Sequence, residues 1–282
     1  MTGAQLEMPG MPRRLFPATP SKLATFSDCP RRYRFAYLDR PSPPKGPPWA
    51  HNSVGSAVHA ALRSWWELPA HERTPRAARQ LLYGHWSDAG FADAEQSATW
   101  RARAAGWLDE YVPTLDPDDE PAGTERQVAA TTERLAITGR VDRIDLRTGD
   151  DGDELVVVDY KTGRHPSTED DARGSPALAL YVLGVRRTLR RPCSRVELHH
   201  LPSGTVAAFE HTDRSLANHV RRAEDVAADI TAATAAREEG AADDEAFPPV
   251  PGQQCGWCDF RSSCPTGRAA APPRETWSFL PT

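Results

Sequence analysis

The first half of the chain carries a helical pattern of hydrophobic and polar positions. Apolar residues recur there at three- and four-residue spacing, which predicts amphipathic helices over residues 53–67, 74–89 and 94–112. An earlier helical stretch, residues 21–38, is interrupted at Cys29-Pro30. Because proline suits the first turn of a helix, a second helix is expected to start there.

From residue 125 the pattern changes to the alternation typical of strands. Residues 125–147 alternate as a β-hairpin with a turn near Glu133-Arg134, and residues 154–160 form a short apolar run suited to a buried strand. The remaining predicted elements are a helix, two strands and a long polar helix, at residues 175–190, 195–201, 204–211 and 213–239. This order predicts one α/β domain, a sheet core with helices on its faces.

The domain is expected to span residues 18–266, between a flexible tail at residues 1–17 and a second tail at residues 267–282. No internal repeat divides it further. Three parts are expected within it. Residues 18–124 are mainly helical and form an N-terminal lobe, residues 125–211 form the sheet core, and residues 212–266 form a helix followed by a cysteine-rich segment.

Composition restricts the functional classes. The net charge of −5 does not indicate nucleic-acid binding by the overall field, so any contact with DNA must come from local basic patches. No apolar run reaches the roughly 18 residues of a membrane helix and no signal peptide is evident, so we expect a cytoplasmic protein that binds no membrane. Only three of the 34 Lys and Arg residues are lysines, so a lysine in a candidate site is informative.

Two carboxylates and a lysine lie at strand ends in the sheet core. Asp159 and Lys161 are two residues apart at the end of the apolar strand, so both side chains point the same way. The preceding hairpin supplies a second acid, for which we choose Asp142, because Asp145 shares its face with two arginines and is expected to face solvent. The alternative is a pair of strand-end salt bridges, Asp159 with Lys161 and Asp142 with Arg140.

Converging carboxylates suit a hard cation such as Mg²⁺, with water and a substrate phosphate completing its coordination. Such an ion lowers the pKa of bound water, and Lys161 would orient that water or neutralise developing charge. His59 lies on the predicted 53–67 helix after Gly55 and Ser56, whose small side chains permit close approach. Neutral imidazole coordinates divalent ions, so His59 is either a further ligand or a hydrogen-bonded core histidine.

Four of the five cysteines form a spaced set. Cys255, Cys258 and Cys264 follow C-x2-C-x5-C, and Cys29 near the other end is the natural fourth ligand. Four thiolates suit either structural Zn²⁺ or a [4Fe–4S] cluster, and spacing does not separate the two. Cys193 stands alone in an Arg/Pro loop and is assigned no role.

These motifs together resemble one nuclease family. A histidine on a GxxxH helix, GxxD, DYK, and one early cysteine with a late C-x2-C-x5-C are similar to the RecB-like nucleases of the PD-(D/E)XK type, over about residues 21–266. The iron–sulfur branch of that family includes the AddB nuclease domain and the CRISPR-adaptation exonucleases. The resemblance implies a restriction-endonuclease-like core with a mixed central sheet. It also implies a Mg²⁺- or Mn²⁺-dependent exonuclease acting on single-stranded DNA or DNA ends in repair, recombination or defence.

The resemblance further implies residue roles. Lys161, Asp159 and Asp142 are the expected catalytic residues. The implied metal ligands are His59, Asp142, Asp159 and the main-chain carbonyl of Tyr160. The four spaced cysteines would hold a [4Fe–4S] cluster, with structural Zn²⁺ as the alternative. Stacking and phosphate contacts to the substrate are expected from Tyr181, Arg31, Arg32 and Arg164.

Two absences bear on function. Family members often carry Gln-x-x-x-Tyr on the helix after the lysine strand. Here Tyr181 matches but Ala177 takes the glutamine position, which leaves a catalytically weak DNA-binding or assembly subunit as an alternative. No GxxxxGK[ST] motif occurs, so the chain has no P-loop ATP motor, and a helicase or a repair or defence protein is the partner to expect. A zinc-stabilised interaction protein with a chance D-x-K is the third hypothesis.

Overall fold

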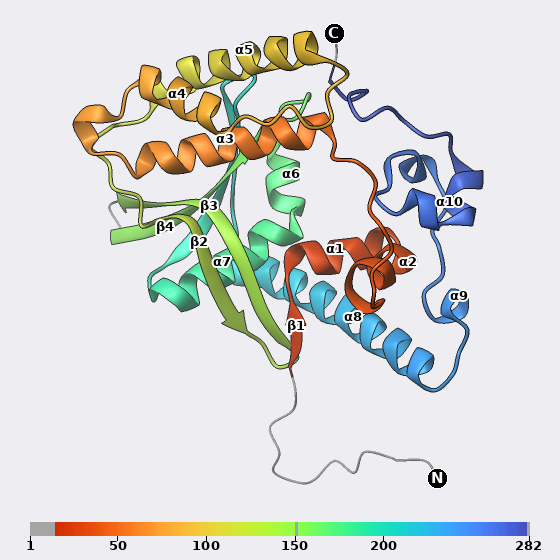
Figure 1. Ribbon diagram of the computed structural model, residues 1–282. Helices are drawn as coiled ribbons and strands as arrows, with labels where there is room; N and C mark the ends of the chain where they lie inside the picture. The colour runs from red at the N-terminus through yellow and green to blue at the C-terminus, as the bar shows by residue number, and fades with distance from the viewer. Residues whose placement is uncertain (1–14, 150–151, 281–282) are drawn as a thin grey trace.

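A six-stranded mixed sheet forms the centre of the computed structural model, which describes residues 15–149 and 152–280. Its strands are β1 (Phe16–Ala18), β2 (Gly123–Thr131), β3 (Leu135–Gly149), β4 (Gly152–Lys161), β5 (Cys193–His200) and β6 (Thr205–Glu210). They run in the order β1-β3-β4-β5-β6, and β2 also pairs with β3 (Figure 1). The pairs β1–β3 and β4–β5 are parallel, and the others are antiparallel.

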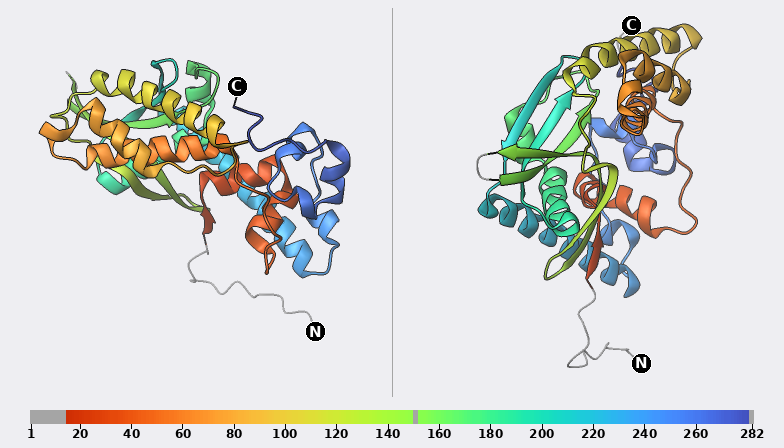
Figure 2. Two further views of the ribbon diagram at one scale, coloured as in Figure 1. Left: turned by 45° about the horizontal axis from the view of Figure 1, so that its top comes forward. Right: turned by 90° about the vertical axis from the view of Figure 1, so that its left-hand side faces the viewer.

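Helices cover both faces of this sheet (Figures 1 and 2). One face carries α3 (Ala50–Trp66), α4 (Pro75–His85) and α5 (Ala94–Tyr111), and the other carries α7 (Pro176–Leu189) with α8 (Asp213–Glu238) packed against it. The short helices are α1 (Pro20–Asp28), α2 (Pro30–Tyr33), α6 (Glu169–Gly174), α9 (Asp243–Ala246) and α10 (Pro265–Ala270). Single 3₁₀ or π turns lie at Arg34–Leu38, Ala70–Glu72, Val112–Thr114, Gln253–Trp257 and Arg261–Ser263.

Local sequence fixes where several helices begin. Thr19, Thr74 and Ser175 each precede a proline, and each side chain accepts a hydrogen bond from a backbone N–H in the first turn. Asp93 and Thr212 cap α5 and α8 in the same way. Such a cap satisfies an N–H that has no partner within the helix, and proline has the right φ for the first helical position.

Strand β4 supplies the hydrophobic cores on both sides of the sheet. Val156 and Val158 pack with buried residues of α3, among them Trp65. Leu155 and Val157 point the other way and pack with α7. A strand with helices on both faces has no solvent side, which explains its continuous apolar run. These features confirm the predicted α/β fold with a mixed sheet between helices.

Both expected tails are shorter than the sequence predicted, because ordered elements extend into them. The sequence assigns residues 1–17 to a tail, but β1 begins at Phe16; residues 1–14 lie outside the described part of the chain. At the other end, α10 occupies residues to Ala270, and Trp277 and Leu280 pack against the core under α3. Both segments are too short for periodicity to reveal them. Every helix in the described residues is too short or too polar to span a bilayer.

Candidate active site

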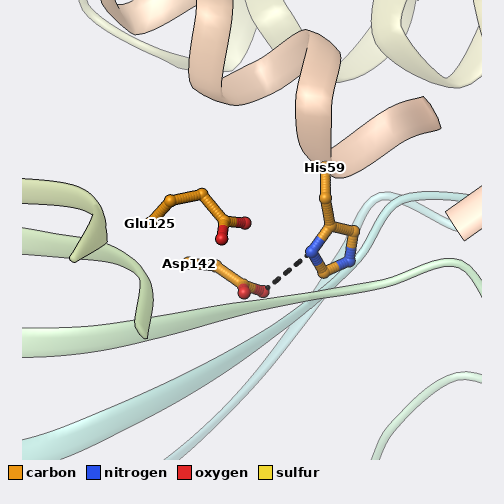
Figure 3. Close-up of side chains that lie close together, drawn as sticks. All are labelled: His59, Glu125 and Asp142. Carbon is orange, nitrogen blue, oxygen red and sulfur yellow. Dashed lines mark ion pairs between the residues drawn. The ribbon is translucent and has the colours of Figure 1, made fainter. Parts of the chain in front are cut away.

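The candidate site lies beneath α3, where the pairing of β3 with β4 ends. Figure 3 shows two of its side chains, His59 and Asp142, facing each other. Backbone pairing between these strands ends at Arg143 and Val158. Asp142 and Asp159 are the next residue on each strand, so both acids lie just beyond the ladder. Of the two side chains, Asp142 contacts His59 and Asp159 pairs with Lys161.

Helix α3 delivers His59 to this point. Gly55, one turn earlier, lies close to the end of β4, because a Cβ at that position would be 3.3 Å from Thr162 Oγ1. His59 Nδ1 lies 3.3 Å from Asp142 Oδ2, and Nε2 lies 3.1 Å from the Tyr160 carbonyl oxygen. Burial favours the neutral ring, but the hydrogen bond to Asp142 and the nearby carboxylate charges together raise the pKa of His59. The same negative field would attract a metal cation.

Glu125 is a site residue that the sequence analysis did not single out. The register of β2 and β3 places it opposite Asp142, and its φ of +44° is in the left-handed region. One nitrogen or oxygen atom from each of His59, Glu125 and Asp142 lies within 4.8 Å of the others (Figure 3). Burial and then the charge of Asp142 raise the pKa of Glu125. The sequence did contain a signal for Glu125, because a hairpin that turns between Glu133 and Arg134 places position 125 opposite position 142.

Asp159 and Lys161 form an ion pair beside this group, with Oδ2 and Nζ 2.5 Å apart. Burial raises the pKa of Asp159, Lys161 opposes that shift, and the charge of Asp142 adds to it. The strand-end pair that the sequence analysis kept as an alternative is therefore present. The second such pair is not, because Arg140 lies 3.7 Å from Glu125 rather than against Asp142. Carboxylates with one ammonium beside them can bind a divalent ion and stabilise an anionic phosphate.

Asp145 is half-buried rather than fully solvent-facing as the sequence predicted. Arg143, on the same strand face, is 3% exposed and lies over the Trp66 ring, with Nε 2.8 Å from Asp145 Oδ1. The prediction was wrong because α3 to α5 cover this face, and a buried arginine paired with a carboxylate replaces the expected surface charge. Asp142 remains the acid that contacts His59.

Comparison with known proteins identifies the family. A family model described as the PD-(D/E)XK nuclease superfamily matches residues 17–265. The chain belongs to this superfamily. No curated protein matches the chain. PD-(D/E)XK nucleases usually use divalent metals, and the imidazole and carboxylates that converge here are suitable ligands.

Two solved structures are distantly similar to this PD-(D/E)XK nuclease. One, provisionally described as an exonuclease from Eubacterium rectale, is 11% identical with a TM-score of 0.43, and the match covers 74% of this chain and 77% of that one. The other, SSO0001, is 14% identical with a TM-score of 0.37, and the match covers 90% and 88%. These likenesses are too weak to add to the family assignment.

Four cysteines of this nuclease line one cavity of about 380 Å³, and they are Cys29, Cys255, Cys258 and Cys264. The cavity lies between the start of α2 and the segment before α10, which lie side by side in Figures 1 and 2. The backbone N–H of Val250 donates to Cys29 Sγ at 3.5 Å, and that of Gly267 donates to Cys264 Sγ at 3.3 Å. The four sulfur atoms thus line one space between two segments that lie far apart in the sequence.

Two arginines predicted to contact DNA, Arg31 and Arg32, line this cavity. Arg31 is 5% exposed, with Nη2 2.6 Å from Asp244 Oδ1 and Nη1 donating to Cys264 Sγ at 3.6 Å. A side chain buried in this way cannot reach a phosphate, so its assignment to DNA is corrected. Arg32 lines the same cavity. Cys193 lies apart at the start of β5, where burial raises its pKa to about 12.

Tyr181 lies close to the carboxylates. Its ring rests on the glycine of the GxxD motif, since a Cβ at Gly139 would be 2.4 Å from Tyr181 Cε1. Burial and then the charges of Asp159 and Asp142 raise the pKa of Tyr181 to about 12. Arg164 is exposed and follows β4 directly. Tyr181 is therefore placed beside the acids, and Arg164 lies three residues beyond Lys161.

Proposed function

We propose that this protein is a Mg²⁺- or Mn²⁺-dependent deoxyribonuclease of the RecB-like branch, an exonuclease acting on single-stranded DNA or DNA ends. The observation that carries the proposal is the convergence of His59, Asp142 and the Tyr160 carbonyl oxygen, with Asp159 and Lys161 alongside. Hard cations take carboxylate and carbonyl oxygens, and imidazole is a common further ligand. The superfamily assignment supports the reaction class, which is hydrolysis by a nuclease.

The residues of the site have distinct proposed parts. His59, Asp142, Asp159 and the Tyr160 carbonyl would hold the ion, with the Glu125 carboxylate close enough to add to its coordination. When bound, the ion would lower the pKa of water and polarise the scissile phosphate. Lys161 orients the attacking water and offsets the negative charge that develops on the phosphate oxygens. The Asp159 carboxylate holds the ammonium at this place, 2.5 Å away.

Tyr181 and Arg164 are the proposed substrate contacts. An aromatic ring beside the carboxylates can stack on an unpaired base, which favours single-stranded DNA or frayed ends as substrate. The exposed guanidinium of Arg164 is free to meet a phosphate, so binding is expected to weaken as salt rises. Half-buried Ala177 on the same helix as Tyr181 has no polar group to add. That observation favours the second candidate function, a catalytically weak DNA-binding subunit that keeps the fold.

The cysteine cavity supports a [4Fe–4S] cluster, with structural Zn²⁺ as the alternative. The resemblance to the iron–sulfur branch favours the cluster, and four cysteines are the ligand number that either group takes. Protein purified without oxygen is expected to contain iron and acid-labile sulfide in equal amounts, about four of each per chain. A colourless protein with one zinc per chain would overturn the cluster and leave the nuclease proposal intact.

The activity is tested on end-labelled single- and double-stranded DNA in a time course with Mn²⁺ and with chelator. We expect metal-dependent release of label that is fastest on single strands, and loss of release in Lys161→Ala and Asp159→Ala. Exposed Arg76→Ala, on α4, is the matched control, because its loss leaves the site untouched. Equal activity in wild type and Asp159→Ala would indicate a contaminant. Binding of DNA without any cleavage would favour the second candidate function.

A further inference from the structure

We infer that Arg143 is a positioning residue that sets the geometry of the metal site through Tyr160, an inference that rests on the proposed function of that site. Tyr160 is 4% exposed, and its backbone touches two proposed ligands at once. Its N–H donates to Asp142 Oδ2 at 2.9 Å, and its carbonyl oxygen lies 3.1 Å from His59 Nε2. The placement of Tyr160 therefore fixes how far apart the acid and the imidazole stand.

Arg143 holds the other end of Tyr160. Its Nη1 donates to the Tyr160 hydroxyl at 3.1 Å and to the Tyr111 hydroxyl at 3.2 Å. Its Nε and Nη2 reach the two carboxylate oxygens of Asp145 at 2.8 and 2.9 Å. A planar guanidinium held by hydrogen bonds at Nη1 and Nη2 and by the ion pair at Nε has little freedom to rotate, so it presents the phenol with a fixed partner.

The contact of Arg143 with Tyr160 connects β3 and β4 beyond the end of their backbone pairing. Backbone pairing of β3 with β4 stops at Arg143 and Val158, so ladder hydrogen bonds do not fix the spacing of Asp142 and Tyr160. The consecutive residues Asp142 and Arg143 supply the missing connection, one to the Tyr160 main chain and the other to its hydroxyl. The open strand ends that admit an ion are thereby kept at one separation.

The Arg143 guanidinium is itself connected to further buried polar groups through Tyr111. The Tyr111 hydroxyl lies 2.8 Å from His199 Nδ1, and His199 Nε2 lies 2.9 Å from Glu197 Oε2. Glu197 also accepts both Nη groups of Arg147 at 2.7 and 2.8 Å. A buried network of paired polar groups resists rearrangement in a low-dielectric interior. Arg143 is thus anchored independently of whether an ion is present.

The test measures Mn²⁺ affinity by titration calorimetry, alongside thermal unfolding with chelator. Tyr160→Phe removes only the hydroxyl and leaves the main-chain groups in place, and we expect the Mn²⁺ dissociation constant to rise roughly tenfold. Arg143→Lys keeps the charge but loses the fork, and the same rise is expected. Tyr83→Phe, at an exposed position on α4, is the matched control, because it removes a tyrosine hydroxyl outside this network. Its Mn²⁺ dissociation constant is expected to stay within about twofold of wild type.

Asp142→Ala distinguishes failure of this inference from failure of the metal site. If Asp142→Ala abolishes Mn²⁺ binding while Tyr160→Phe merely melts earlier with unchanged affinity, Arg143 and Tyr160 are structural and the positioning role is overturned. An equal rise in Tyr83→Phe and Tyr160→Phe would also overturn it, because the effect would not depend on the Tyr160 hydroxyl. If Asp142→Ala binds Mn²⁺ as wild type does, the proposed site itself is wrong.

Discussion

Glu125 combines a strained backbone with a place in the proposed metal site. Its φ of +44° costs a residue with a side chain roughly 1–2 kcal/mol, a cost that glycine does not have. Glycine loses more backbone entropy on folding, which offsets part of this relief. The free energy of unfolding of Glu125→Gly in chelator is therefore expected to be about 1 kcal/mol higher than that of wild type. The change also removes a carboxylate within 4.8 Å of its Asp142 counterpart, and the relief of repulsion acts in the same direction. A gain of this size raises Tm by about 2–4 °C.

Mn²⁺ is expected to reverse this order of stability. An ion that binds only the folded state stabilises it by RT ln(1 + [L]/Kd), so binding that is roughly tenfold weaker loses about 1.4 kcal/mol. That loss exceeds the gain from relieved strain. Glu125→Gly should therefore melt above wild type in chelator and at or below it in saturating Mn²⁺.

Differential scanning calorimetry of wild type, Glu125→Gly and Glu125→Gln separates the two effects. Glu125→Gln keeps a side chain on the strained backbone but loses the charge. Its Tm should therefore rise less than that of wild type when Mn²⁺ is added, and its Tm in chelator should be close to that of wild type. A Glu125→Gly protein that melts below wild type in chelator would refute the strain argument. A Mn²⁺-induced rise in Tm equal to that of wild type would remove Glu125 from the metal site.

Three further predictions concern packing, pH and the cysteine cavity. Gly139→Ala places a Cβ 2.4 Å from the Tyr181 ring. We therefore expect the free energy of unfolding, measured in urea, to fall by about 1–3 kcal/mol and the tyrosine ring to be displaced. Burial and then the charge of a neighbouring histidine lower the pKa of His211 to about 4, below its unfolded value of 6.5. The unfolded state then binds more protons between these values, so stability should fall as pH drops from 6.5 to 4, and less so in His211→Gln. Cys258→Ser should lose bound iron and lower Tm, whereas Cys193→Ser should keep its iron.

Helix and strand positions were predictable because the chain repeats one local pattern within each element. Residues 94–112 carry apolar positions at helical spacing, and α5 spans Ala94–Tyr111. The geometric relation of Asp159 to Lys161 was predictable for the same reason, since a strand repeats every two residues. The convergence of His59 with Asp142 needed the family resemblance as well, because periodicity does not say which helix crosses which strand.

Arg143 and Asp145 show what the sequence did not reveal. An arginine next to an acid on a strand reads as a solvated face, yet α3 and Trp66 cover this one. Burial of a charged pair depends on the partners that tertiary packing brings, here Tyr111 and Tyr160, which come from other parts of the chain. Local patterns carry no record of such partners, so the buried network was missed while the strand itself was found.

The proposed binding of one divalent ion between α3 and the ends of β3 and β4 can be measured directly. Crystals soaked in Mn²⁺ give an anomalous difference map that locates the ion without reference to activity. We predict one strong peak within bonding distance of His59, Asp142, Asp159 and the Tyr160 carbonyl oxygen, at roughly 2.0–2.3 Å. Well-ordered side chains at these positions with no peak between them, or a peak only at another place, would contradict the proposed nuclease site.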